Sequence, residues 1–165
     1  MTCLPRQADT ERTVLNAVPV DDSDGWGTGL VRDRDPRTGE TRLRLERWKK
    51  NGRNYDNPHT WRVRPDFWDE ECEAVSNFKR FGGKSPPGDL PIDQYLSPTE
   101  YRLVRKDGDR WVAVVRLDRP YNGERIRLYH WNPRDGSVRQ KWTIGRDWSE
   151  LAALASRHLK NKAVA

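Results

Sequence analysis

The feature that most constrains this chain is an internal repeat. Residues 42–45 (RLRL) match residues 125–128 (RIRL) at an offset of 83, and residues 61–63 match residues 142–144 at an offset of 81. The two-residue difference falls between the matched segments, in a turn, where changes of length are tolerated. The 165-residue chain is therefore predicted to contain two copies of one small unit of about 80 residues each.

The second copy shows its elements most clearly. Strands are expected at residues 101–105, 110–118, 125–131 and 137–144, separated by turns rich in Gly, Pro, Asn and Asp. The apolar residues then change to helical spacing, where Asp147 is a suitable N-cap and Glu150, three positions on, its capping-box partner. The predicted order is four strands followed by a helix.

The first copy repeats this order. Strands are expected at residues 13–20, 26–34, 41–48 and 59–64, and Asp66 is a suitable cap for the helix that follows. The sequence predicts an α+β fold of two tandem β-β-β-β-α units, in which antiparallel sheets, each followed by a helix, form a pseudo-dimer. The domain boundaries expected from this pattern are a mobile tail at 1–12, a first unit at 13–81, a Gly/Pro-rich linker at 82–100 and a second unit at 101–165.

The positive charge is concentrated in two blocks. The net charge is +6, and residues 26–66 and 101–147 carry +5 and +6, whereas residues 1–25 and 67–100 carry −3 and −4. Two basic blocks separated by acidic stretches are expected of two surfaces that face phosphates. The hydrophobic fraction of 34% is low, but eight Trp residues provide large apolar groups for a core.

Each copy also places arginines and an aromatic residue on one side of its third strand. Alternate residues of a strand point to the same face, and this groups Arg42, Arg44, Glu46 and Trp48 in the first copy and Arg125, Arg127, Tyr129 and Trp131 in the second. Cations follow a phosphate backbone and release counterions, while flat rings stack on unpaired bases. This combination predicts a surface that binds a single nucleic-acid strand.

The candidate binding residues are these two rows and the basic or aromatic residues around them. They are Arg32, Arg42, Arg44, Trp48, Lys49, Lys50, Arg53, Arg62, Arg116, Arg119, Tyr121, Arg125, Arg127, Tyr129, Trp131, Arg134, Arg139 and Lys141. Alternating arginines are also typical of a solvated strand face that resists aggregation. By contrast Trp61, Trp68, Trp142 and Trp148 fall on packing positions and are expected in the core.

The element order and the basic, aromatic third strand resemble the single-stranded-DNA-binding superfamily that includes transcriptional positive cofactor 4 and the plant Whirly proteins. The likeness lies in residues 126–131 (IRLYHW), 141–144 (KWTI) and 147–151 (DWSEL). Members of the cofactor type are dimers whose curved sheets bind single strands, so the resemblance implies a single-chain pseudo-dimer. The contact residues that it implies are Arg116, Arg127, Trp131, Arg139 and Lys141 in the second copy, with Arg32, Arg44, Trp48 and Arg62 in the first.

Other classes of function find less support. Residues 83–85 (GKS) lack the earlier glycine of a phosphate-binding loop, and the His and Cys residues lack metal-ligand spacing. We expect no enzyme activity, no cofactor and no metal. With no apolar run of the signal-peptide or membrane-spanning kind, the chain is expected in the cytoplasm, nucleoid or nucleus.

The expected partner is single-stranded DNA, bound with little sequence preference in transcription, replication or repair, together with proteins of those processes. RNA bound by the same surface and a protein-interaction adaptor without nucleic acid remain alternatives. The chain is expected to be either a monomeric pseudo-dimer or a homodimer.

Overall fold

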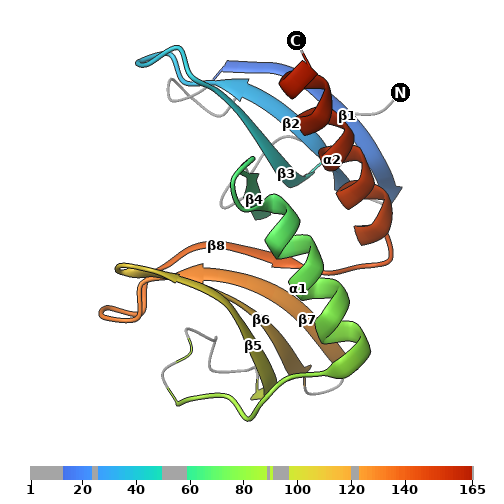
Figure 1. Ribbon diagram of the computed structural model, residues 1–165. Helices are drawn as coiled ribbons and strands as arrows, with labels where there is room; N and C mark the ends of the chain where they lie inside the picture. The colour runs from blue at the N-terminus through green and yellow to red at the C-terminus, as the bar shows by residue number, and fades with distance from the viewer. Residues whose placement is uncertain are drawn as a thin grey trace. The chain divides into compact units, whose positions relative to one another are not determined.

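In the residues that it describes, the structure, a computed structural model, contains two antiparallel sheets and two helices. It describes residues 13–23, 26–49, 59–88, 90, 97–119 and 123–164. The elements are β1 (Thr13–Ser23), β2 (Trp26–Arg34), β3 (Thr41–Lys49), β4 (His59–Val63), α1 (Trp68–Phe81), β5 (Ser97–Asp107), β6 (Arg110–Arg119), β7 (Gly123–Trp131), β8 (Val138–Thr143) and α2 (Trp148–Val164). The predicted α+β fold, with two tandem units of four strands and a helix, is confirmed (Figure 1).

The two sheets share their strand order and their irregularities. Each is an antiparallel sheet with its strands in chain order, β1-β2-β3-β4 and β5-β6-β7-β8. The edge strands β1 and β5 each contain two register shifts, and those of β5 follow those of β1 at an offset of 84 residues. The shifts are Val14/Asn16 and Pro19/Asp21 in β1, and Pro98/Glu100 and Leu103/Arg105 in β5. Because bulges are specific local features of a strand pair, their agreement supports a duplicated unit more strongly than the sequence match does.

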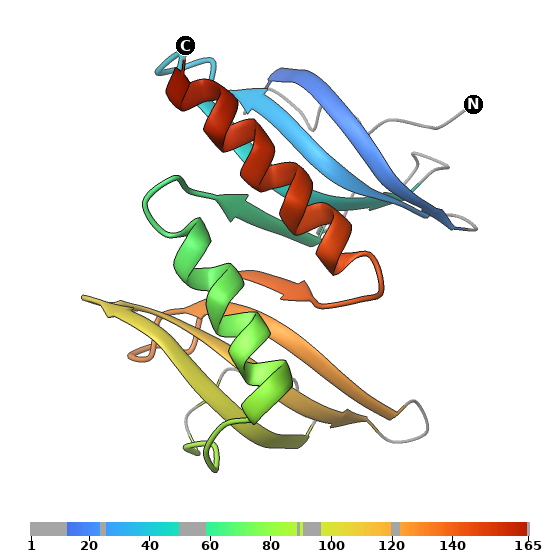
Figure 2. The same cartoon turned by 45° about the vertical axis from the view of Figure 1, so that its right-hand side comes forward.

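Each compact unit combines the sheet of one sequence copy with the helix of the other copy. The first compact unit joins the sheet β1–β4 to the C-terminal segment from Arg146, which includes α2, whereas the second runs from Asp69 to Gly145 and so contains α1 and the sheet β5–β8. Figure 2 shows α2 crossing the first sheet and α1 crossing the second. The predicted boundaries at 13–81 and 101–165 therefore describe the sequence repeat but not the compact units. Both sheets offer a similar apolar face, and local sequence does not specify which helix covers it.

The contacts of α1 identify the face of the second sheet that carries the helix. Arg105 of β5 lies 3.6 Å from Glu71 of α1, and the guanidinium of Arg116 in β6 lies 5.3 Å from the ring centroid of Phe78. Four apolar residues on this face are fully buried or nearly so, and they are Val112, Val114, Leu128 and Trp142.

Equivalent residues form the core of the first unit, where α2 contacts β2. The buried apolar residues on the helix-bearing face of its sheet are Leu30, Leu43, Leu45, Trp61 and Val63, and those of α2 are Trp148, Leu151 and Ala155. Trp68 also belongs to this unit, where its ring centroid lies 5.7 Å from that of Trp148 and its Nε1 donates to Ser156 Oγ over 3.1 Å. The four tryptophans expected in the core, Trp61, Trp68, Trp142 and Trp148, are all buried, as predicted.

The predicted linker is shorter than expected. Helix α1 ends at Phe81, where Gly82 takes a positive φ of 72° and its N–H donates to the carbonyl of Phe78. Lys84 then pairs through its backbone with Tyr101 of β5. Strand β5 itself begins at Ser97 rather than at residue 101, so the expected 82–100 linker extends into the sheet.

None of the helices in the described part of the chain is both long and apolar enough to span a membrane.

Candidate nucleic-acid interface

The predicted binding rows lie on the face of each sheet that points away from the helix. We call these the arginine faces, and cross-strand register defines their residues. The first contains Gly27, Gly29, Val31, Asp33, Arg42, Arg44, Glu46, Trp48, Thr60 and Arg62. The second contains Tyr101, Leu103, Lys106, Trp111, Ala113, Val115, Leu117, Arg125, Arg127, Tyr129, Trp131, Lys141 and Thr143. The grouping of arginines with an aromatic on one face of β3 and of β7 is therefore confirmed.

Some candidates lie elsewhere. Arg32 pairs with Leu43, and Arg116 pairs with Ile126, so both belong to the faces that carry the helices. Arg134 lies in the turn after β7, where its Nε is 3.3 Å from Asp109, and Arg139 is an exposed residue of β8. Lys50, Arg53 and Tyr121, and the side chains of Lys49 and Arg119, lie outside the described residues.

The aromatic residues of the rows are buried, and the expectation that they present open rings to bases is wrong for this conformation. Trp48 is 1% exposed, and Tyr129 and Trp131 are each 2% exposed. A ring must offer a face to solvent before a base can stack on it. The strand pattern identifies the side of the sheet on which a ring lies, but not what covers that ring.

Trp48 is covered in part by its own sheet. A Cβ atom added to Gly27, its cross-strand partner, would lie 2.5 Å from Cε2 of the indole. The absence of a side chain at Gly27 thus lets the Trp48 ring lie against the backbone of β2.

Tyr129 and Trp131 belong to an apolar cluster with Ala113, Val115 and Leu117. Partly buried residues pack on this cluster, and they are Leu90, Tyr101, Leu103 and Trp111. Leu90 comes from the segment predicted as a linker, and its side chain helps to cover the second arginine face.

Ion pairs neutralise the arginines of the first arginine face. Arg44 Nε lies 3.0 Å from Oδ2 of Asp33, a carboxylate that is 1% exposed. The turn between β2 and β3 supplies two further carboxylates: Arg42 lies 3.1 Å from Asp35, and Arg62 lies 3.2 Å from Glu40. These pairs are internal to the unit and oppose its positive charge.

The second arginine face has a different polar pattern. Arg127 donates from Nε to Thr143 Oγ1 over 2.8 Å and from a terminal nitrogen to Tyr129 Oη over 3.3 Å, and both acceptors are neutral. Arg125 is exposed, and Lys141 is half-buried beside Tyr129. Among the described residues, cross-strand register places no carboxylate on this face.

Two half-buried tryptophans that carry cations were missed as candidates. Arg47 lies over the ring of Trp26 at 5.0 Å, and the Lys106 ammonium lies 4.2 Å from the ring centroid of Trp111. The sequence signal for Trp111 was its place at the start of a strand next to a basic hairpin, but its cation became evident only from the pairing of Lys106 with Trp111.

The thiol of Cys72 is a further reactive group, and it lies on α1. Cys72 has a free, half-buried thiol, and burial, followed by the charges of Glu71 and Asp69, raises its pKa to about 12. This thiol is therefore protonated at neutral pH and is a poor nucleophile. Among the residues that the structure describes, no group of three or more His, Cys, Asp or Glu side chains is arranged to hold a metal ion.

No protein-family model matches the chain, and no curated protein matches it either.

Proposed function

We propose that this protein binds single-stranded DNA with little sequence preference, mainly through its phosphates and without a chemical step. The net charge of +6 and the pI of about 9.5 favour an anionic partner. We place this activity in transcription, replication or repair, inside the cell.

The observation that carries the proposal is the row of Arg125, Arg127 and Lys141 on one sheet face without a helix. Alternate residues of a strand are about 7 Å apart, so Arg125 and Arg127 offer regularly spaced donors to an extended backbone. Guanidinium groups bind phosphate with two parallel hydrogen bonds. A sheet face suits an unpaired strand, whereas the major groove of a duplex is usually read by a helix or a two-stranded ribbon.

The buried rings change the balance of the mechanism. Because Trp48, Tyr129 and Trp131 are covered, phosphate neutralisation supplies most of the affinity and stacking supplies less. Binding should therefore weaken steeply with salt and discriminate little among bases.

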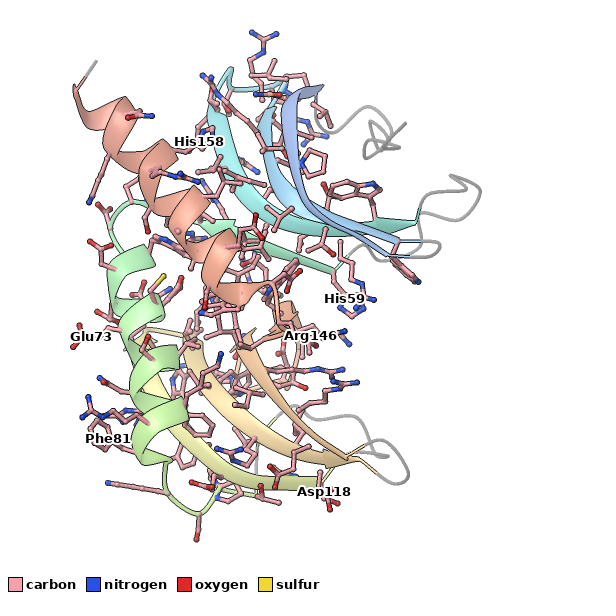
Figure 3. All side chains as sticks on the ribbon, turned by 90° about the vertical axis from the view of Figure 1, so that its right-hand side faces the viewer. His59, Glu73, Phe81, Asp118, Arg146 and His158 are labelled. Atoms are coloured by element: carbon pink, nitrogen blue, oxygen red, sulfur yellow. The ribbon has the colours of Figure 1, made fainter. Side chains whose placement is uncertain are left out.

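The test is a fluorescence-anisotropy titration of a labelled thymidine 20-mer at several salt concentrations, with duplex DNA and matched RNA as competitors. We expect binding that prefers the single strand and falls with salt, at a slope of about 0.7 per phosphate contact. If RNA competes as well as DNA does, the ligand is single-stranded nucleic acid in general and not DNA alone. Absence of binding at low salt would overturn the proposal and favour a protein partner, for which Phe81, 69% exposed at the end of α1, is a candidate contact (Figure 3).

A further inference from the structure

We infer that Arg42 and Arg62 of the first arginine face form a site for one phosphate of the bound strand, and that the carboxylate of Glu40 occupies this site in the free protein. This inference rests on the proposed function. It adds Glu40, the residue directly before β3, as a group that lowers the affinity for the strand by competing with its phosphate.

The Glu40 carboxylate bridges two guanidinium groups. Its Oε1 accepts a hydrogen bond from Nη2 of Arg62 over 3.2 Å, and its Oε2 lies 3.8 Å from Nη2 of Arg42. Each oxygen of this anion therefore lies beside a different arginine. Guanidinium groups bind phosphate oxygens through the same kind of charge-assisted hydrogen bond. The carboxylate thus occupies the place that a phosphate would take.

The carboxylates that pair with the arginines of this face are held with different firmness. Asp33 is 1% exposed. Asp35 accepts the N–H of Arg37 with Oδ1 over 2.8 Å and a hydrogen bond from Arg42 with Oδ2 over 3.1 Å, so its turn fixes it. The side chain of Glu40, by contrast, is 52% exposed. An exposed ion pair contributes little net free energy, so Glu40 is the carboxylate that a phosphate displaces.

The two arginines keep their positions when Glu40 leaves. Arg42 lies 3.1 Å from Asp35, and Arg62 is the cross-strand partner of Arg44. The side chains of Arg42 and Arg62 are 29% and 27% exposed, so a strand reaches them from solvent. A site whose side chains are already ordered loses less conformational freedom when it binds.

The exchange sets how much the first arginine face contributes to binding. A phosphate that enters between Arg42 and Arg62 must displace the Glu40 carboxylate, so the loss of the old contacts offsets part of the gain from the new ones. Removing the carboxylate should therefore raise the affinity for the strand.

The test compares this carboxylate with a matched one. Glu40→Gln and Glu124→Gln each raise the net charge from +6 by one, so the long-range effect of charge is similar. Glu124 makes an ion pair of the same length, 3.2 Å, with Arg116, and register places both on the helix-bearing face of the second sheet. With the labelled thymidine 20-mer at low salt, we expect Glu40→Gln to bind about fivefold more tightly and Glu124→Gln to change the affinity less than about twofold.

A double-mutant cycle connects the gain to the two arginines. Arg42→Gln/Arg62→Gln should lose one phosphate contact, which lowers the salt slope by about 0.7. In that background Glu40→Gln should no longer raise the affinity, because no phosphate site is left for it to vacate. A purely long-range effect of the Glu40 charge predicts the same gain in both backgrounds. Circular dichroism of all variants separates changed binding from lost structure.

The outcomes distinguish this inference from the proposed function. Equal gains from Glu40→Gln and Glu124→Gln would overturn the inference and leave single-strand binding intact. A gain from Glu40→Gln that persists without Arg42 and Arg62 would do the same. If the natural protein itself does not bind the 20-mer, the proposed function fails, and this inference fails with it.

Discussion

The two arginine faces have the same backbone register and opposite chemistry. Cross-strand pairs place Asp33 beside Arg42 in the first unit, where the second has Leu117 beside Arg125. Further along, Gly29 lies opposite Glu46, and the equivalent pair is Ala113 and Tyr129. One repeat pairs its arginines with carboxylates. The other covers its sheet with apolar groups, and its Arg127 donates to the neutral oxygens of Thr143 and Tyr129. One backbone register thus supports two different arrangements of polar side chains.

The energetics of the two solutions differ accordingly. A buried ion pair contributes little net stability because desolvation offsets its attraction, although removing one partner is strongly destabilising. An apolar cluster gains stability in proportion to the area that it removes from water. We therefore expect the first face to be sensitive to single changes of charge and the second to loss of volume.

The largest effect is expected from the buried tryptophans. Trp48→Ala and Trp131→Ala should each lower the free energy of unfolding by about 3–5 kcal/mol, because each leaves a large cavity. Urea denaturation followed by circular dichroism measures this. A loss below about 1 kcal/mol for either variant would mean that its ring is not a core group and is available for stacking after all.

The next largest effect concerns the ion pair of Arg44 with Asp33, which is compared with the neutral hydrogen bonds of Arg127. Arg44→Ala removes the guanidinium that lies 3.0 Å from the buried Asp33 carboxylate and should cost about 3 kcal/mol. Arg127→Ala removes hydrogen bonds to neutral groups and should cost about 1 kcal/mol.

The double variant Asp33→Leu/Arg44→Leu provides the control for this ion pair. It replaces both charges and copies the leucine found at the position of Leu117, so it should recover most of the stability that Arg44→Ala loses. Equal losses from Arg44→Ala and Arg127→Ala in thermal denaturation would remove the energetic distinction between the two faces.

A smaller effect is expected where the repeats differ by one methyl group. A Cβ atom at Gly29 would lie 2.2 Å from the carbonyl oxygen of Val18 and 2.9 Å from Cα of Pro19. Gly29→Ala should therefore cost about 1–3 kcal/mol through overpacking. The reverse change at the equivalent position, Ala113→Gly, should cost only about 0.5–1 kcal/mol. If the denaturant midpoints rank the two variants in the opposite order, then the packing of β1 on β2 and of β5 on β6 differs from what the strand registers predict.

The smallest change in stability is expected from a substitution in α1 that copies the residue of α2. Cys72 of α1 corresponds to Ala152 of α2, counted from Trp68 and Trp148, so Cys72→Ala should change stability by less than about 1 kcal/mol. Since the folded pKa of about 12 exceeds the ordinary value of 9.0, the unfolded chain gives up this proton first. The contribution of the thiol to stability is therefore complete below pH 9 and is lost as the pH rises toward 12.

Alkylation measures this thiol directly. In a Cys3→Ser background, iodoacetamide should modify Cys72 far more slowly at pH 8.5 in the folded chain than in urea, because little thiolate is present. Equal rates in the two conditions would contradict the raised pKa.

Much of the fold could be predicted because alternation of polar and apolar residues is a local signal. Strand β2 has the bounds that the pattern predicted, and α2 begins directly after its predicted cap, Asp147, whose carbonyl accepts from the N–H of Leu151. The early start of β5 was missed because Pro98 resembles a continuation of the Pro-rich linker. Proline is tolerated there because β5 is an edge strand, where one side of the backbone needs no partner.

The candidate site could be predicted only in part. Sequence alternation correctly grouped Arg125 with Arg127 and Arg42 with Arg44, since residues two apart on a strand share a face. It could not show that Asp33 pairs with Arg44, or that Lys106 lies over Trp111, because those contacts join neighbouring strands. Arg32 and Arg116 were assigned to the binding surface although register places them on the opposite faces.

The sequence by itself therefore determined the duplication, the order of strands and helix in each copy, and the arginine row of each third strand, because these depend on residues close together in the chain. The tertiary structure decided which helix covers which sheet, which rings are buried and which arginines are paired with carboxylates. Those outcomes depend on contacts between residues far apart in the chain. The two sheets have similar apolar faces and similar rows of arginine. Their difference lies in the residues across the strands and in the residues that cover each face.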